Sequence, residues 1–92
     1  MPISRTTVVV PVEDVAFREI DREAVLLHLG SGHYYGMNQV ATRAWTLLIE
    51  GTALGAVVDR LAAEFEVTPD VLERDLSAWL STLVEKGLVR TQ

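Results

Sequence analysis

The stretch GSGHYYGMNQVATRAW, residues 30–45, decides the fold, because the spacing of the apolar side chains changes within it. Up to Met37 the residues suit an extended strand, and the glycines at 30 and 32 supply a turn before that strand. From Asn38 onward apolar residues recur at helical spacing, and Asn38 itself is a favourable N-cap residue. We therefore predict that strands precede this point and that helices follow it.

Toward the N-terminus the sequence predicts two more strands, at residues 16–20 and 24–29, with a turn at 21–23. Together with the strand at 33–37 they would form an antiparallel meander. The first fifteen residues contain two prolines, which cannot donate ladder hydrogen bonds. We therefore expect residues 1–15 to be an extended N-terminal arm that is loosely held, and residues 16–92 to be the folded domain.

Toward the C-terminus the pattern predicts three helices. The first spans residues 39–50, and Thr52 is expected to cap the second. The third spans residues 69–86, and Gly87 provides the left-handed cap that ends it. The expected fold class is α+β, a three-stranded antiparallel sheet followed by three helices, in a winged-helix-like arrangement.

The composition excludes several classes of protein. A chain of 92 residues with 49% hydrophobic content fits one core, and the absence of cysteine excludes disulfides, zinc–thiolate sites and thiol catalysis. A formal charge of −5 disfavours nucleic acid and acidic membranes as partners. The apolar run at residues 8–12 is too short for a signal peptide or a membrane span, so we expect a cytoplasmic protein.

Catalytic and metal-binding patterns are not found in the sequence. The serines have no evident base beside them, and residues 30–32 lack the longer glycine pattern of a phosphate loop. His28 and His33 are an odd number of residues apart, which is expected to place them on opposite faces of the sheet. The sequence therefore predicts a protein that is not an enzyme and that has no cofactor and no metal site.

The strand at residues 33–37 ends the predicted sheet and lacks the proline, lysine or acidic residues that usually protect such an edge. Its side chains alternate, so Tyr34 and Tyr35 face opposite sides and at least one tyrosine is accessible. Trp79 lies at the border of the apolar side of the third helix. It can be either a core residue or the wall of a groove beside the open strand.

Two segments, HYYGMNQVATRAW at 33–45 and ERDLSAWLSTLVEKGLV at 73–89, resemble the PqqD-like family of RiPP recognition elements. The resemblance covers about residues 16–90, although the Pro-Glu hairpin and the Asp-Gly of the quinone-cofactor branch are missing. It implies a domain that binds the leader segment of a ribosomally made precursor peptide and presents it to modifying enzymes. Members of this length are most similar to those of lasso-peptide pathways, where the partner is a leader peptidase.

The resemblance also implies how the peptide binds: as an antiparallel strand added to residues 33–37, in a groove beside the third helix. The residues that it implies for peptide binding are His33, Tyr34, Tyr35, Gly36, Met37, Val71, Asp75, Trp79 and Thr82. The open edge predicted from the residues is what such binding requires. A proline at Tyr35 is accordingly expected to abolish peptide binding.

Two other functions remain open from the sequence. A winged-helix DNA-binding regulator is one, but residues 69–86 carry four acidic and two basic side chains, whereas a recognition helix should be positive. An interaction domain that forms homodimers through its open strand is the other. For the peptide-binding function we expect a monomer or a weak dimer.

Overall fold

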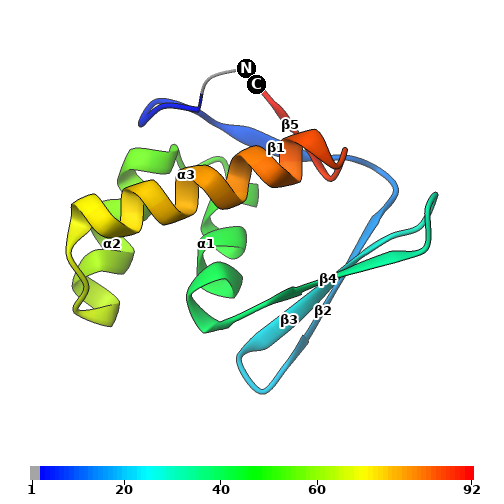
Figure 1. Ribbon diagram of the computed structural model, residues 1–92, viewed down its shortest axis with the longest axis horizontal. Helices are drawn as coiled ribbons and strands as arrows, with labels where there is room; N and C mark the ends of the chain where they lie inside the picture. The colour runs from blue at the N-terminus through cyan, green and yellow to red at the C-terminus, as the bar shows by residue number, and fades with distance from the viewer. Residues whose placement is uncertain (1–2) are drawn as a thin grey trace.

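The computed structural model describes residues 3–92, which form two small sheets and three helices (Figure 1). The elements in chain order are β1 (Val9–Pro11), β2 (Val15–Ile20), β3 (Glu23–His28), β4 (His33–Met37), α1 (Gln39–Ile49), α2 (Leu54–Phe65), α3 (Pro69–Glu85) and β5 (Val89–Thr91). Strands β2, β3 and β4 form an antiparallel sheet in that order. The predicted α+β fold, with a three-stranded sheet followed by three helices, is confirmed.

The β2–β3 hairpin turns through two residues, Asp21 and Arg22, both with positive φ (52° and 72°). This is the geometry of a type I′ turn, whose twist matches that of the strands it joins. The turn sets Ile20 opposite Glu23 and fixes the register of the whole hairpin. As a result, successive rows of cross-strand partners lie on alternate faces of the sheet. Phe17, Leu26 and Tyr35 share one face, and Arg18, Val25 and Gly36 share the other.

One face of the sheet packs against α1, which lies between the sheet and the other helices (Figure 1). Leu26 is fully buried on this inner face, and the ring of Phe17 stacks on that of Trp45 with a centroid separation of 6.2 Å. The core then continues through leucines of all three helices. Those that are fully buried are Leu48, Leu54, Leu61 and Leu80.

Two of the three helix caps predicted from the sequence are present in the structure, and one is not. The side chain of Asn38 accepts a hydrogen bond from the Ala41 N–H at 2.9 Å, and Gly87 has φ +78° just after α3, so both predicted caps are confirmed. The cap predicted at Thr52 is wrong, because α2 starts one residue later, with Ala53 as its N-cap. The Thr52 N–H instead donates to the carbonyl of Leu47 and closes the end of α1.

The N-terminal segment differs from the predicted loosely held arm, apart from residues 1 and 2, which lie outside the described residues. β1 pairs antiparallel with β5, and Val9 is 1% exposed within the core. Arg5 donates to Asp59 at 2.8 Å and also to Glu73, contacts that raise its pKa above the ordinary value. The segment therefore packs against the helices, and it contains a turn in which the Thr7 N–H donates to the Ser4 carbonyl at 3.1 Å.

Across residues 3–92, no helix combines the length and the apolar character needed to cross a membrane.

Candidate functional site

Strand β4 lies at one edge of the three-stranded sheet, and among the described residues no strand pairs with its outer side. The same sheet has a second edge, β2, but that strand carries Arg18 and Glu19, side chains of the kind that protect edges from pairing. β4 has neither proline, lysine nor acidic residues. It is therefore the edge that is open to an incoming strand.

The hydrogen bonds on the far side of β3 determine which peptide groups of β4 are free. The N–H of Leu29 donates to the carbonyl of Asp14 at 2.7 Å, so residues 23, 25 and 27 of β3 also direct their peptide groups toward β2. The type I′ turn at the other end of the hairpin requires the same alternation. Residues 24, 26 and 28 must then direct theirs toward β4.

The partners of these three residues on β4 are Met37, Tyr35 and His33, whose peptide groups consequently point inward to β3. Tyr34 and Gly36 point their N–H and C=O groups outward. A proline at Tyr35 would also break the bonding between β3 and β4, so its effect would not be confined to the open edge. The positions that test the edge are Tyr34 and Gly36.

A hollow of about 300 Å³ lies beside the end of β4, between the first turn of α1 and α3. Its lining is mainly apolar, with one carboxylate. The lining residues are Asn38, Val40, Ala41, Val67, Val71, Leu72, Asp75, Leu76 and Trp79. We call this hollow the α1–α3 groove.

Three of the residues predicted on α3, namely Val71, Asp75 and Trp79, line the α1–α3 groove together. Trp79 is also half-buried against the core, so it is both a core residue and a groove wall. Thr82 lies outside the groove and donates its hydroxyl to the carbonyl of Ala78 at 3.1 Å.

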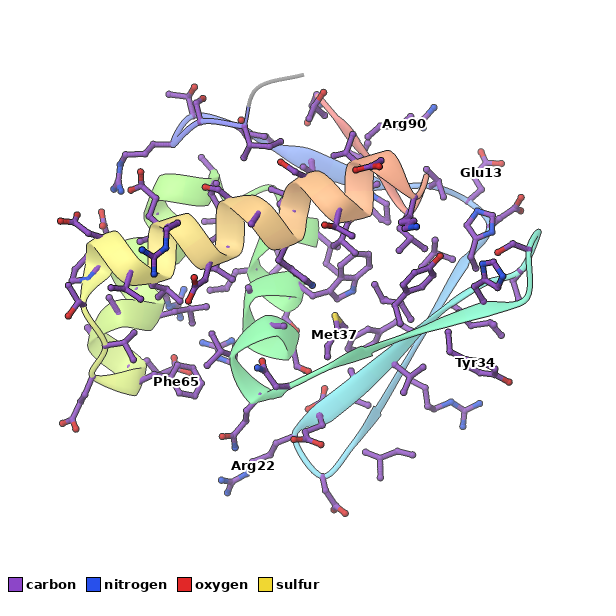
Figure 2. The ribbon with its side chains drawn as sticks, in the orientation of Figure 1. Glu13, Arg22, Tyr34, Met37, Phe65 and Arg90 are labelled. Atoms are coloured by element: carbon purple, nitrogen blue, oxygen red, sulfur yellow. The ribbon has the colours of Figure 1, made fainter. Side chains whose placement is uncertain are left out.

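The residues predicted on β4 differ in exposure according to the face on which they lie. Tyr34 is 74% exposed and points away from the helices, whereas Met37 is 5% exposed and points toward them (Figure 2). Tyr35 is half-buried and packs against the core, and His33 and Gly36 are exposed. The prediction that at least one tyrosine is accessible is confirmed.

Sequence reasoning missed six of the residues that line the α1–α3 groove, namely Leu72 and Leu76 of α3 and four residues outside that helix. Asn38, Val40 and Ala41 come from the start of α1, and Val67 comes from the loop before α3. A signal for the first three existed, because residues that directly follow an edge strand must lie near the end of that edge. The position of Val67 depends on how α2 and α3 pack.

The two histidines lie on the same face of the sheet, and the expectation of opposite faces is wrong. His28 and His33 are directly opposite each other across β3 and β4, and cross-strand partners share a face. The odd separation in sequence applies within one strand only, and here a turn intervenes. The Nδ1 atom of His28 accepts a hydrogen bond from the Ser31 N–H at 3.1 Å, and residues 3–92 contain no cluster of three metal-ligating side chains.

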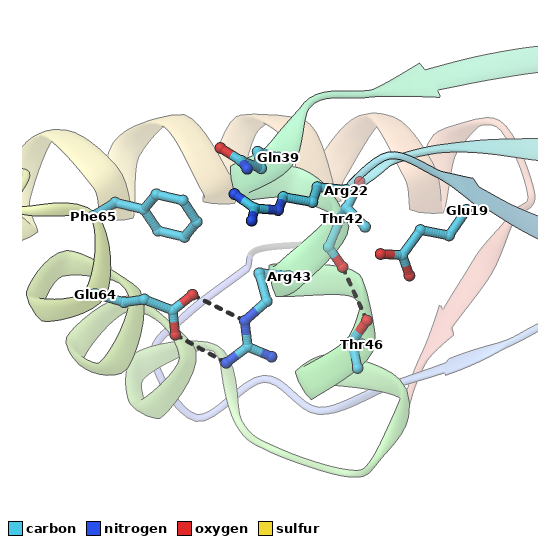
Figure 3. Close-up of a pocket in the computed structure, with 8 residues that line it drawn as sticks. All are labelled: Glu19, Arg22, Gln39, Thr42, Arg43, Thr46, Glu64 and Phe65. Atoms are coloured by element: carbon cyan, nitrogen blue, oxygen red, sulfur yellow. Dashed lines mark hydrogen bonds and ion pairs between the residues drawn. The ribbon is translucent and has the colours of Figure 1, made fainter.

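A larger hollow, of about 600 Å³, opens on a different side of α1, next to α2 and the β2–β3 turn (Figure 3). Arg43 crosses it and donates two hydrogen bonds to Glu64, both at 2.9 Å, and these bonds lower the pKa of Glu64. Its lining is polar and its charges are paired or balanced, so this hollow offers little apolar surface to a ligand. Size alone does not make it the site, and we assign the site to β4 and the α1–α3 groove.

The sequence model of the PqqD family, described as coenzyme PQQ synthesis protein D, matches residues 23–89. This chain belongs to the PqqD family. The match begins at β3 and ends in β5, so it contains β4 and every residue that lines the α1–α3 groove. No curated protein matches the sequence.

Two solved structures resemble this PqqD-family domain over nearly its full length. One is TbiB1 in complex with the TbiA(beta) leader peptide, which is 40% identical, has a TM-score of 0.80, and covers 88% of this chain and 94% of that chain. The other is a lasso peptide synthetase B1 complexed with the leader peptide. It is 28% identical, has a TM-score of 0.81, and its alignment covers 89% of this chain and 96% of that chain. Both similar proteins were thus solved with a leader peptide bound.

Proposed function

We propose that this chain binds the leader segment of a ribosomally synthesised precursor peptide as an added strand on β4, and presents it to a maturation enzyme such as a leader peptidase. The observation that carries the proposal is an unpaired β4 edge that runs into an apolar groove. The two similar structures support it, because each holds a leader peptide. The chain would act as a recognition element in the cytoplasm and would not itself be an enzyme.

Main-chain hydrogen bonds would provide much of the attraction. The outward peptide groups of Tyr34 and Gly36 would pair with two residues of the leader, spaced two apart. His33, Tyr35 and Met37 would support that edge from within the sheet. This assignment replaces the expectation that all five residues of β4 bond to the leader backbone.

Side-chain selectivity would come from the groove. An antiparallel leader would have its N-terminal part beside Met37, where β4 meets the groove, and its C-terminal part beside the β3–β4 turn. A leader side chain just N-terminal to the paired segment would then reach Val71, Asp75 and Trp79, with Thr82 one turn further along α3. Truncating an aromatic anchor such as Trp79 should cost about 2 kcal/mol or more in binding.

The experiment is titration calorimetry of the chain with a synthetic leader peptide, using two proline variants. Gly36→Pro removes an outward N–H from β4, and a Cβ at this position meets nothing within 4 Å. Glu19→Pro places the same residue on the other free edge, where the alternation also points the N–H outward. Gly36→Pro should abolish binding and Glu19→Pro should preserve it; normal binding by Gly36→Pro would show that strand addition to β4 is wrong.

A further inference from the structure

The start of α2 is capped by main-chain carbonyls from the N-terminal end of the chain. The N-cap residue of this helix makes no side-chain hydrogen bond. Instead, the Leu54 N–H donates to the carbonyl of Thr7 at 2.9 Å, and the Gly55 N–H donates to the carbonyl of Arg5 at 2.8 Å. The N–H groups in the first turn of a helix need partners of this kind. The carbonyls come from residues 3–8, a segment that we call the N-terminal strap.

The side chain of Arg5 extends the strap across two helices. Its guanidinium donates to Asp59 of α2 at 2.8 Å and to Glu73 of α3, and it also donates to the carbonyl of Gly55 at 3.2 Å. A guanidinium carries several donors in a rigid planar fork, so one arginine can hold two carboxylates in a fixed relative position. Arg5 therefore connects α2 to α3 from outside the core.

Gly55 is the residue that allows the strap to lie this close to α2. A Cβ at this position would stand 2.9 Å from the Cβ of Arg5 and 3.0 Å from its Nε. Glycine is an unfavourable residue within a helix, and the close approach of another part of the chain explains its presence here. The sequence of α2 thus provides the space that the strap occupies.

Arg5 holds α3 on the flank opposite to the α1–α3 groove. At about 100° per residue, Glu73 lies about 160° around the helix from Val71 and from Asp75, and about 120° from Trp79. The last three of these residues line the groove. A rotation of α3 about its axis that separated Glu73 from Arg5 would therefore also move the groove residues.

The strap is connected to the groove through α2 as well. The C-cap of α2 is Glu66, which has φ 54°, and the next residue, Val67, lines the groove. The Val67 N–H donates to the carbonyl of Ala62 at 3.1 Å, so the position of Val67 follows that of the helix. The strap caps one end of α2, and the other end leads directly into the groove wall.

From these contacts we infer that Arg5 is a positioning residue for the peptide site, because the strap holds α2 and α3 so that the α1–α3 groove is already formed before the leader binds. This inference rests on the proposed function and adds to it a segment that supplies no groove-lining residue. A site that is formed in advance loses less conformational freedom on binding, which raises affinity. The strap precedes residue 23, where the family match begins, so the family pattern does not include it.

The test uses the full chain and two variants that disturb the strap in different ways, Arg5→Ala and Gly55→Ala. The first removes both ion pairs, and the second displaces Arg5 while giving α2 a better helix-forming residue. Arg43→Ala is the matched control, because it breaks an ion pair of similar exposure, with Glu64, that joins α1 to α2. Circular dichroism and urea unfolding establish that each variant is folded.

Two measurements separate positioning from general stability. The first is stopped-flow anisotropy of a fluorescently labelled synthetic leader, from the precursor encoded beside this chain, which gives the association and dissociation rates. The second is acrylamide quenching of tryptophan fluorescence in the free protein. The chain has two tryptophans, of which Trp45 is 2% exposed, so quenching reports on Trp79 in the groove wall.

Both strap variants should bind the leader about three- to fivefold more weakly, because a smaller fraction of the free protein has the groove formed. The loss should appear in the association rate, with an unchanged dissociation rate, and acrylamide should quench Trp79 more strongly. Arg43→Ala should match the wild type in all three quantities.

Wild-type association rates and quenching in both strap variants would overturn the inference. So would an equal loss in Arg43→Ala, which would indicate a general effect of stability, or a loss confined to the dissociation rate, which would indicate direct contact with the peptide. Failure of the wild-type chain to bind the leader would overturn the proposed function instead, and the quenching of Trp79 would still test how the strap positions α3.

Discussion

Replacing Val71 with alanine should weaken peptide binding without destabilising the fold. Val71 lines the α1–α3 groove and is 44% exposed in the free protein. Fully burying a valine is worth about 1.5–3 kcal/mol, so covering its exposed part contributes up to about 1 kcal/mol. That corresponds to about a fivefold increase in Kd for the leader.

The same substitution should change the free energy of unfolding by less than about 0.5 kcal/mol. The partial loss of packing is offset by the higher helix propensity of alanine, which is worth about 0.5 kcal/mol. Titration calorimetry with the leader and urea unfolding measure the two quantities. Ile49→Ala removes an apolar side chain of similar exposure, 42%, outside the groove, and should leave the Kd unchanged. A wild-type Kd for Val71→Ala, or an equal loss for Ile49→Ala, would refute the use of the groove.

Other predictions concern stability. Val9→Ala should lower the free energy of unfolding by about 2 kcal/mol in urea titrations, because Val9 is 1% exposed in the core; a change near zero would show that the N-terminal segment is loosely held. The hydrogen bonds from Arg43 lower the pKa of Glu64, so this ion pair stabilises the folded state. Its stabilisation is complete above the ordinary glutamate pKa and is lost as the pH falls through the lowered pKa of Glu64. In thermal melts from about pH 7 to about pH 3, the melting temperature of the wild type should include this pH-dependent loss, and that of Glu64→Gln should not. An identical dependence of melting temperature on pH in both proteins would contradict the prediction.

The sequence was sufficient for features that depend on local chemistry. Asn38 marks the change from strands to helices because its side chain caps α1, and Gly87 ends α3 because it tolerates a positive φ. The open edge at residues 33–37 followed from the order of the strands. Three of the groove residues on α3 followed from the family resemblance, which pointed to one side of that helix.

Features that depend on contacts between distant segments were not predictable. The pairing of β1 with β5 joins Val9 to Thr91 at the other end of the chain, and no local sequence pattern predicts this pairing. The direction of the peptide groups of β4 depends on the hydrogen-bond alternation set by the β2–β3 turn and by Leu29. For that reason the sequence could not show that a proline at Tyr35 would disrupt the pairing with β3 as well as the open edge.

The pairing of β1 with β5 also determines how the domain can be joined to other proteins. The Gln92 N–H donates to the carbonyl of Val8 at 2.8 Å, so the two ends of the fold are neighbours (Figure 1). A polypeptide entering at residue 8 and leaving at residue 92 would return to nearly the same point, on the side of the helices away from the three-stranded sheet. Such a module can be inserted into a surface loop of a host enzyme with little distortion of either partner, and both tethers would stay clear of β4.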